Sequence, residues 1–222
     1  MYEFKLTHDG SSTLYSKQFN ETYHSIFGAI SESNHIYIKN GIQYYKDFFQ
    51  INAINILEIG FGTGLNAILT WKYACENNIR VQYFSVEKYP LSIQEIQNLN
   101  YSDLLQAPWQ ERFKTLHTFE WNKSNVIKDF KISKLEADLL NLPKMNTVFD
   151  IIYFDAFSPE KQPELWTEQV FENLFALMKK NGILVSYCAK GLVKRNLKKV
   201  GFTLQTPPGA LRKREMIRAV KL

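Results

Sequence analysis

The sequence predicts an α/β protein built on a doubly wound, mostly parallel sheet, and three observations lead to this prediction. From residue 54 onward, short apolar runs typical of buried strands alternate with segments whose apolar residues recur at helical spacing. The first of these runs stops at Gly60, inside a glycine-rich turn that opens a helical segment. The chain has 222 residues, of which 45% are hydrophobic and 22% charged, an ordinary globular composition. Such alternation indicates crossovers that place ligands at the carboxyl ends of the strands.

The chain divides into a polar, aromatic segment, residues 1–50, and an alternating segment, residues 51–222. We expect the first to be a small β-containing extension or lid, because it holds short alternating stretches such as His35–Ile38. The second should form the Rossmann-like domain. Its predicted strands are residues 54–59, 81–86, 149–154, 183–187, 202–204 and 216–220. Its predicted helices are residues 65–78, 168–180 and 191–200, the second ending at Asn181-Gly182 and the third at Gly201.

Composition argues against several classes of protein. Cys75 and Cys188 lie far apart without CxxC spacing, and the four histidines are scattered, so no metal site is predicted. No apolar run approaches the ~18 residues of a membrane span. The N-terminus lacks the apolar core of a signal peptide. We therefore expect a cytoplasmic protein that contacts no membrane.

The net charge of +5 is distributed unevenly along the chain. Residues 188–222 carry ten Lys or Arg and a single acid, Glu215. A basic segment on an otherwise mildly acidic body either binds a polyanion or is a solvated surface, and charge alone leaves both open. On the predicted helix 191–200, Lys194 and Lys198 lie one turn apart, as do Arg195 and Lys199, and each pair repels unless an anion compensates.

The strongest local motif is the glycine turn EIGFGTG, residues 58–64. Glycines allow a tight turn and a close ligand approach, and the following helix offers free N–H groups. A dinucleotide fold prefers G-x-G-x-x-G, which seats a pyrophosphate. Here the spacing is G-x-G-x-G, and Glu58 precedes the first glycine by two residues. An acid there repels a pyrophosphate but can hold an ammonium group, which favours S-adenosylmethionine; a turn without a ligand remains the alternative.

Two further acids follow strand-like or loop segments. Glu87 ends the second predicted strand, where a carboxylate typically accepts hydrogen bonds from ribose hydroxyls. Pairing with Lys88 at the surface is its alternative role. Asp138 lies in a loop before the next strand and could accept the adenine amino group or cap a helix, with equal support from its local sequence.

The stretch DAFSP, residues 155–159, carries the candidate chemistry. Asp155 follows an apolar strand and should project into the crevice at the strand end. The stretch resembles the acidic tetrapeptides of amino-group methyltransferases. An attacking amine needs a neutral lone pair in line with the sulfonium methyl, and a carboxylate can accept its N–H bonds and orient it. Phe157 either stacks on a base or packs in the core.

Taken together, the motifs resemble a known family, the methyltransferases of tRNA 5-methylaminomethyl-2-thiouridine synthesis, and in particular its stand-alone members. The matching stretches run in family order: Glu58–Leu65 (EIGFGTGL), Glu87–Leu91 (EKYPL), Asp155–Trp166 (DAFSPEKQPELW), Gly191–Phe202 (GLVKRNLKKVGF) and Arg212–Met216 (RKREM). The resemblance implies a class I S-adenosylmethionine methyltransferase fold, with its last strand antiparallel. It also implies methylation of the exocyclic amine of 5-aminomethyl-(2-thio)uridine at the tRNA wobble position.

The resemblance also implies roles for individual residues. Glu58, Gly60, Gly62 and Gly64 would contact the methionyl part of the cofactor, Glu87 its ribose and Asp138 its adenine end. Asp155 would lie between cofactor and amine, with Phe157 beside the base. The tRNA anticodon loop would contact the basic C-terminal residues: Lys190, Lys194, Arg195, Lys198, Arg212, Lys213 and Arg214.

Some family members are fused to a flavin-dependent oxidase. This chain is too short to include one and has no second glycine fingerprint, so we expect no flavin; a monomer is favoured. Three alternatives stay open: a methyltransferase of the same fold acting on a small-molecule or protein amine, a non-catalytic tRNA-binding protein, and a nicotinamide-dependent oxidoreductase, which the glycine spacing disfavours.

Overall fold

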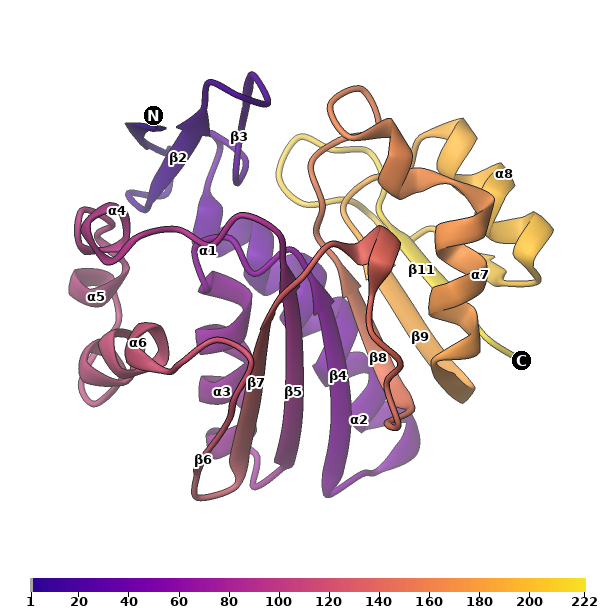
Figure 1. Ribbon diagram of the computed structural model, residues 1–222, viewed down its shortest axis with the longest axis horizontal. Coiled ribbons are helices and arrows are strands. Elements are labelled where there is room, and N and C mark those ends of the chain that lie inside the picture. The colour runs from indigo at the N-terminus through magenta and orange to yellow at the C-terminus, as the bar shows by residue number, and fades with distance from the viewer. Residues whose placement is uncertain (1) are drawn as a thin grey trace.

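The computed structural model describes residues 2–222, which form two sheets (Figure 1). The small N-terminal sheet consists of β1 (Tyr2–Leu6), β2 (Ser12–Ser16) and β3 (Glu21–Thr22). The large sheet consists of β4 (Ala53–Ile59), β5 (Arg80–Glu87), β6 (Ser124–Ile127), β7 (Phe130–Glu136), β8 (Phe149–Phe154), β9 (Met178–Ser186), β10 (Thr203–Gln205) and β11 (Ile217–Val220). No helix within residues 2–222 is long and apolar enough to cross a membrane.

The large sheet has the order β10-β11-β9-β8-β4-β5-β7-β6. Strands β9, β8, β4, β5 and β7 are mutually parallel, whereas β11 is antiparallel to both of its neighbours. The predicted doubly wound sheet with an antiparallel last strand is therefore confirmed. The chain leaves β4 toward β5 on one side and returns to β8 on the other, so the order of strands reverses between β4 and β8. Ligands of such sheets bind at this reversal, outside the carboxyl ends of the strands.

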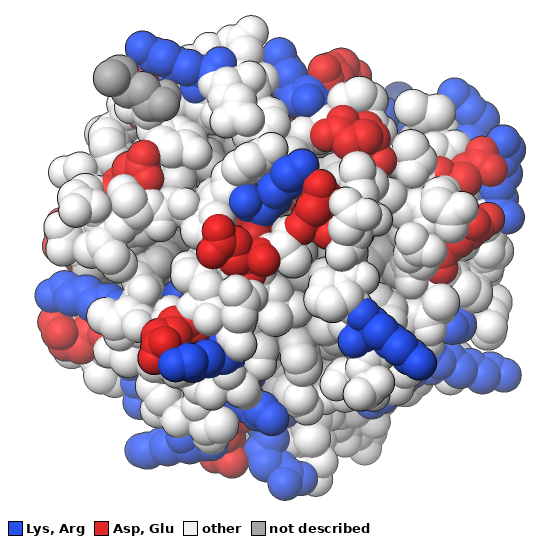
Figure 2. All heavy atoms as spheres, in the orientation of Figure 1, with Lys and Arg blue, Asp and Glu red and all other residues white. Residues whose placement is uncertain are grey.

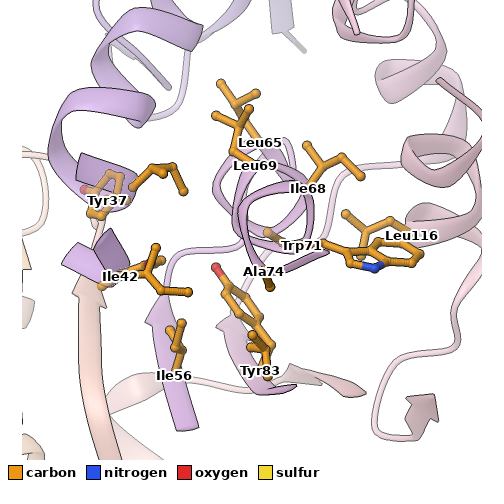
Figure 3. Close-up of a cluster of buried hydrophobic side chains, with 14 of the residues drawn as sticks. Tyr37, Ile42, Ile56, Leu65, Ile68, Leu69, Trp71, Ala74, Tyr83 and Leu116 are labelled. Atoms are coloured by element: carbon orange, nitrogen blue, oxygen red, sulfur yellow. The ribbon is translucent and has the colours of Figure 1, made fainter. Parts of the chain in front are cut away.

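Helices cover both faces of the sheet (Figure 1). One apolar cluster lies between the sheet and the helices α1 (Ala29–Ser33), η1 (Asn34–Gln43), α2 (Tyr44–Phe49), α3 (Leu65–Glu76) and α6 (Trp109–Thr118). The other lies beneath α7 (Glu168–Ala176) and α8 (Gly191–Val200). Strand alternation explains the division, because Ile54 and Ile56 of β4 belong to the first cluster and Leu57 and Ile59 to the second. Figure 3 shows Ile56 and Tyr83 of the sheet below the apolar residues of α3.

The expectation of strand structure around His35–Ile38 is wrong. These residues lie in η1, a ten-residue π-helix between α1 and α2. Ile36, Tyr37 and Ile38 are all buried, as on the wide apolar face of a helix. Over so short a stretch, this pattern cannot be distinguished from that of a strand. The β-containing part of the N-terminal segment spans β1 to β3, and the helices that follow it pack on the large sheet. The domain boundary at residue 50 stays a prediction.

The predicted end of the helix 168–180 is also wrong. Helix α7 ends at Ala176, and β9 begins at Met178, before Asn181-Gly182. Asn181 has a φ of 63°, and the pairing of β8 with β9 shifts register between Phe149 and Ile151. A Cβ on Gly182 would lie 2.9 Å from the Lys179 carbonyl oxygen. The dipeptide therefore makes an irregularity within the strand and does not end the helix.

Residues 88–148, for which few elements were predicted, contain further short elements. They are α4 (Ile93–Gln97), α5 (Tyr101–Leu104), α6, β6, β7 and the 3-10 helix η2 (Leu139–Asn141). A second 3-10 helix, η3 (Pro163–Trp166), follows β8. Strand β7 extends the parallel sheet by pairing with β5, so its carboxyl end joins the same edge as those of β4, β5 and β8.

Candidate active site

A cavity of about 250 Å³ lies at the carboxyl ends of β4, β5, β7 and β8. Gly60, Glu87, Asp138 and Asp155, which were predicted from four separate motifs, all line it. The N-terminal β2–β3 hairpin contributes an opposite wall. The sequence-predicted strand ends therefore converge on one site at the reversal of strand order, as the fold requires.

The glycine turn brings the backbone of β4 against that of β8. Gly60 has a φ of 89°, its N–H donates to the Val86 carbonyl at 2.9 Å, and an added Cβ would lie 2.6 Å from the Asp155 carbonyl oxygen. Gly62 has a φ of 47°, and a Cβ there would lie 2.9 Å from the Tyr23 ring. Both positions therefore require glycine, for conformation and for space. Gly64 begins α3 with a φ of 73° but does not line the cavity.

Glu87 joins two loops at the end of β5. One carboxylate oxygen, Oε2, accepts a hydrogen bond from the Gly62 N–H at 3.0 Å, and Oε1 accepts one from the Tyr89 N–H at 2.8 Å. Burial raises its pKa, although these backbone donors oppose the rise. The carboxylate is thus fixed in orientation on the cavity wall, with lone pairs left to accept hydroxyl groups of a ligand.

Asp138 has one of the two roles that its local sequence left open, that of a helix cap. Its Oδ1 caps η2 by accepting from the Leu140 N–H at 3.0 Å, and its Oδ2 pairs with Lys88 Nζ at 2.7 Å. The hydrogen bond from Lys88 lowers its pKa, so it is ionised at neutral pH. It also lines the cavity beyond Glu87.

Asp155 follows directly on β8 and lines the cavity beside the glycine turn. Its Oδ2 accepts a hydrogen bond from Asn66 Nδ2 at 2.8 Å. Burial raises its pKa to about 6, against the opposing effects of Tyr37 and Asn66. At neutral pH the group is therefore mostly an anion that can accept an N–H bond while remaining close to its titration range.

Aromatic rings cover the cavity next to Asp155. Phe157 stacks on Phe19 with ring centroids 4.5 Å apart and meets Tyr23 edge-on at 5.0 Å. Glu21 Oε2 accepts hydrogen bonds at 3.0 Å from both the N–H and the hydroxyl of Ser158. The hairpin is thus attached to the loop after β8, and Phe157 of that loop both lines the cavity and packs against rings of the hairpin.

Sequence reasoning missed several residues of this site. Asn66 carried a usable signal, since it lies one residue into the helix that the glycine turn opens. Phe19 and Glu21 carried none, because their partners in the loop after β8, Phe157 and Ser158, lie more than 130 positions away.

Glu58 is placed differently from the other predicted cofactor residues. Its side chain is fully buried beneath α3 and does not line the cavity. A direct contact with the methionyl part of a cofactor stays a prediction that this position does not support.

The basic C-terminal residues are less uniform than the sequence indicates. Lys213 lines the cavity, where it pairs with Glu32 at 2.7 Å and lies over the Tyr187 ring. Lys194 pairs with Glu215 at 2.8 Å, so an anion from within the chain already compensates one member of the predicted repelling pair. Lys190 pairs with Glu160. On the face shown in Figure 2, acidic and basic side chains are mixed along the edge that carries α7 and α8.

The remaining predicted tRNA residues are Arg195, Lys198, Arg212 and Arg214. Arg212 lies over the Phe27 ring, with 4.5 Å between its guanidinium carbon and the ring centroid. None of the four lines the cavity. Residues 2–222 contain no group of three or more His, Cys, Asp or Glu that could hold a metal ion, and both cysteines are free.

Comparisons with known proteins find relatives that match nearly the whole chain. The chain is 31% identical over 96% of its length to a protein of Leptospira interrogans named tRNA 5-methylaminomethyl-2-thiouridine biosynthesis bifunctional protein MnmC, and 30% identical over 95% to the Cupriavidus metallidurans protein of the same name. It covers 34% and 32% of their lengths, so it spans about a third of these relatives.

Solved structures give the same result for the fold. The crystal structure of MNMC2 from Aquifex aeolicus superposes with a TM-score of 0.82 at 28% identity, covering 99% of this chain and 69% of the other. The CurJ carbon methyltransferase shares the fold alone, with a TM-score of 0.53 at 14% identity over 89% of this chain and 56% of the other. A family model described as S-adenosyl-L-methionine-dependent methyltransferase matches residues 86–222, more than half of the chain. With the glycine turn, Glu87 and Asp155 around one cavity, the chain therefore belongs to the S-adenosyl-L-methionine-dependent methyltransferases.

Proposed function

We propose that this enzyme transfers a methyl group from S-adenosylmethionine to the exocyclic amine of 5-aminomethyl-(2-thio)uridine at the wobble position of tRNA. The product would be 5-methylaminomethyl-(2-thio)uridine. The observation that carries the proposal is the Asp155 carboxylate, held by Asn66 at the cavity wall and bordered by the Phe157 ring. The names of the relatives that match nearly the whole chain support the tRNA substrate. A tRNA substrate would place the enzyme in the cytoplasm.

The residues around the cavity fit the cofactor. Gly60 and Gly62 line the cavity with bare backbone that a ligand can approach, and the Glu87 carboxylate can accept ribose hydroxyls at the end of β5. Asp138 lies further along the same wall, in reach of the adenine end in the proposed arrangement. A pyrophosphate would meet these carboxylates unfavourably, whereas S-adenosylmethionine carries no phosphate. When bound, it supplies an electrophilic methyl group on a positively charged sulfur.

In the proposed reaction, Asp155 accepts an N–H bond of the neutral amine and orients its lone pair toward the methyl carbon. The new N–C bond forms as the S–C bond breaks, and S-adenosylhomocysteine leaves with the electron pair on sulfur. The amine nitrogen is then positively charged, and its excess proton passes to Asp155 or to water. Phe157 offers a flat apolar surface on which the flipped base can stack.

The basic residues on α8 and before β11 would contact phosphates of the anticodon loop. Lys198, Arg195, Arg212 and Arg214 have no ion-pair partner within residues 2–222 and remain available to an external anion. Lys190, Lys194 and Lys213 would have to exchange a glutamate for a phosphate. Lys213, at the cavity wall, is the best placed of the seven to reach the nucleotide itself.

The test is a methyl-transfer assay with labelled S-adenosylmethionine and tRNA that carries 5-aminomethyl-2-thiouridine. Nucleosides from the digested tRNA are analysed by mass, with unmodified tRNA as the substrate control. A gain of one methyl group on the aminomethyl nucleoside, lost in Asp155→Ala, supports the proposal. Cofactor binding without transfer to this tRNA would reject the tRNA substrate and leave an amine methyltransferase acting on another molecule.

A further inference from the structure

Glu58 lies beneath the active site in the interior of the fold. Alternation along β4 directs Ile56 and Glu58 to the same face, the one that α3 covers. In the sheet, Glu58 is paired in register with Ser85 of β5 and Tyr153 of β8. Its side chain has no exposed surface, and it is absent from the wall of the cavity.

The surroundings of Glu58 are polar but contain few donors in place. Oε2 accepts a hydrogen bond from the Ser85 hydroxyl at 2.6 Å, whereas Oε1 has no partner. Other buried polar atoms on the same face also lack partners: Asn66 Oδ1, Thr70 Oγ1, Tyr83 OH and Tyr153 OH. Figure 3 shows the Tyr83 hydroxyl directed toward α3. Within residues 2–222, no Lys or Arg forms an ion pair with Glu58 or Asp155.

A carboxylate in such a place is strongly disfavoured. A fully buried anion with one hydrogen bond and no cation takes up a proton, because its desolvation is not compensated. A second carboxyl group, Asp155, accepts a hydrogen bond from Asn66, and its charge opposes ionisation of Glu58, because two neighbouring carboxyls hold one proton more readily than none. Burial, with a smaller contribution from the Asp155 charge, raises the pKa of Glu58 to about 8.

We propose that Glu58 is a neutral positioning residue, which keeps Asn66 available to Asp155, and that it does not bind the ammonium group of the cofactor. The Asn66 amide presents its nitrogen to Asp155, since its oxygen there would face a carboxylate. The same amide also faces Glu58. An ionised Glu58 would compete with Asp155 for the amide hydrogens, whereas a neutral one leaves them to Asp155. The inference rests on the proposed catalytic role of Asp155.

The variant Glu58→Gln tests the inference, because glutamine has the shape of a neutral carboxyl and is uncharged at every pH. Its amide oxygen can accept from Ser85, and its amide nitrogen can donate as a protonated carboxyl would. Calorimetry of S-adenosylmethionine binding at pH 7 should give an affinity within about twofold of wild type, and kcat should stay within about threefold. Glu58→Ala, which removes the group, should lower kcat at least tenfold. Glu76→Gln, at an exposed position of α3, is the control.

If the Glu58 carboxylate instead held the ammonium of the cofactor, Glu58→Gln would lower the affinity at least tenfold, and the inference would be wrong. The affinity is measured without tRNA. If the wild-type protein binds the cofactor but does not methylate the tRNA, the proposed function is rejected. The affinities of wild type and Glu58→Gln for the cofactor still show whether Glu58 holds the ammonium group.

A pH series gives a second readout that a merely structural role would not change. The titratable groups that face Glu58 are Tyr83 and Tyr153 from the strands and Asp155 beyond β8, while α3 contributes the uncharged Asn66 and Thr70. Infrared difference spectra should show the carbonyl band of a protonated carboxyl at pH 7, which is lost above pH 8 and is absent in Glu58→Gln. Asp155→Asn should retain that band. Its absence from the wild-type protein at pH 7 would overturn the inference.

Discussion

Replacing Gly60 by alanine tests whether the close approach of β4 and β8 forms the site. The added Cβ would lie 2.6 Å from the Asp155 carbonyl oxygen, and such contacts become ordinary only at 3.4 Å, so the two loops must separate by roughly 0.8 Å. A left-handed residue other than glycine costs about 1–2 kcal/mol, and overpacking adds about 1–3 kcal/mol. Unfolding should therefore require about 2–5 kcal/mol less free energy.

The separation also moves Asp155 and the turn on which the cofactor would rest. A displacement near 1 Å at a reacting group costs about 10²-fold in rate. We expect Gly60→Ala to weaken S-adenosylmethionine binding at least tenfold by calorimetry and to lower the methyl-transfer rate at least a hundredfold.

The matched control is Gly201→Ala. Gly201 has a φ of 109°, but a Cβ there would meet only Phe175, at 3.9 Å. It should cost about 1–2 kcal/mol of stability from strain alone, with cofactor affinity unchanged. Thermal unfolding and calorimetry on both variants separate strain from displacement. Wild-type affinity in Gly60→Ala would refute the argument that this contact sets the geometry of the site.

Three further predictions concern charge. Burial lowers the pKa of Lys134 to about 8, below its unfolded value, so its buried charge destabilises the fold at pH 7 and does so less as pH rises through 8. Lys134→Met should therefore raise the free energy of unfolding at pH 7 by about 1–3 kcal/mol, measured by chemical denaturation. Lys131→Met, on the exposed side of β7, is the control and should not raise it. Burial raises the pKa of Asp155 to about 6, so the methyl-transfer rate should fall as pH drops through about 6. Asp155→Asn should lose about 10²–10⁴-fold at pH 7 and should not show this fall; a wild-type rate that is flat down to pH 5 would contradict the role of Asp155 as an ionised acceptor. Lys198→Glu should weaken tRNA binding in filter-binding titrations and reduce the slope of log affinity against log salt concentration by about 1. The control Lys72→Glu, on α3, should change neither the affinity nor the slope. Equal effects of the two variants would exclude α8 as a specific contact of the tRNA.

The sequence identified the parts of the site that depend on local order along the chain. A strand followed by glycines predicts a turn at the sheet edge, and parallel strands bring Gly60, Glu87 and Asp155 to that same edge. These three positions follow from period and topology alone. The ten-residue π-helix η1 was missed because its segment His35–Ile38 resembles a strand over a short window, although Ile36, Tyr37 and Ile38 are all buried.

The position of Glu58 shows a second limit. Its place beside the glycine turn indicated a cofactor contact, yet the two-residue period of β4 turns it toward the helix together with Ile56. The two-residue period can be seen in the sequence. Which face of the sheet α3 covers depends on the tertiary structure, so the burial of Glu58 could not be predicted from the sequence. Contacts such as Phe19 on Phe157 depend on a hairpin folding back over the sheet, and no local pattern records them.

The attachment of Glu21 to Ser158 has a consequence for synthesis of the chain on the ribosome. The hairpin is translated first, but the loop that it docks on emerges only after about 140 further residues. At 5–20 residues per second, this interval lasts roughly 7–30 seconds. During that time the hairpin has neither Ser158 nor Phe157 to pack against, so residues that are made before the loop reach their final contacts late. For that interval the rings of Phe19 and Tyr23 lack the Phe157 ring that they contact in the folded protein, and a chaperone that binds emerging aromatic segments would find them there.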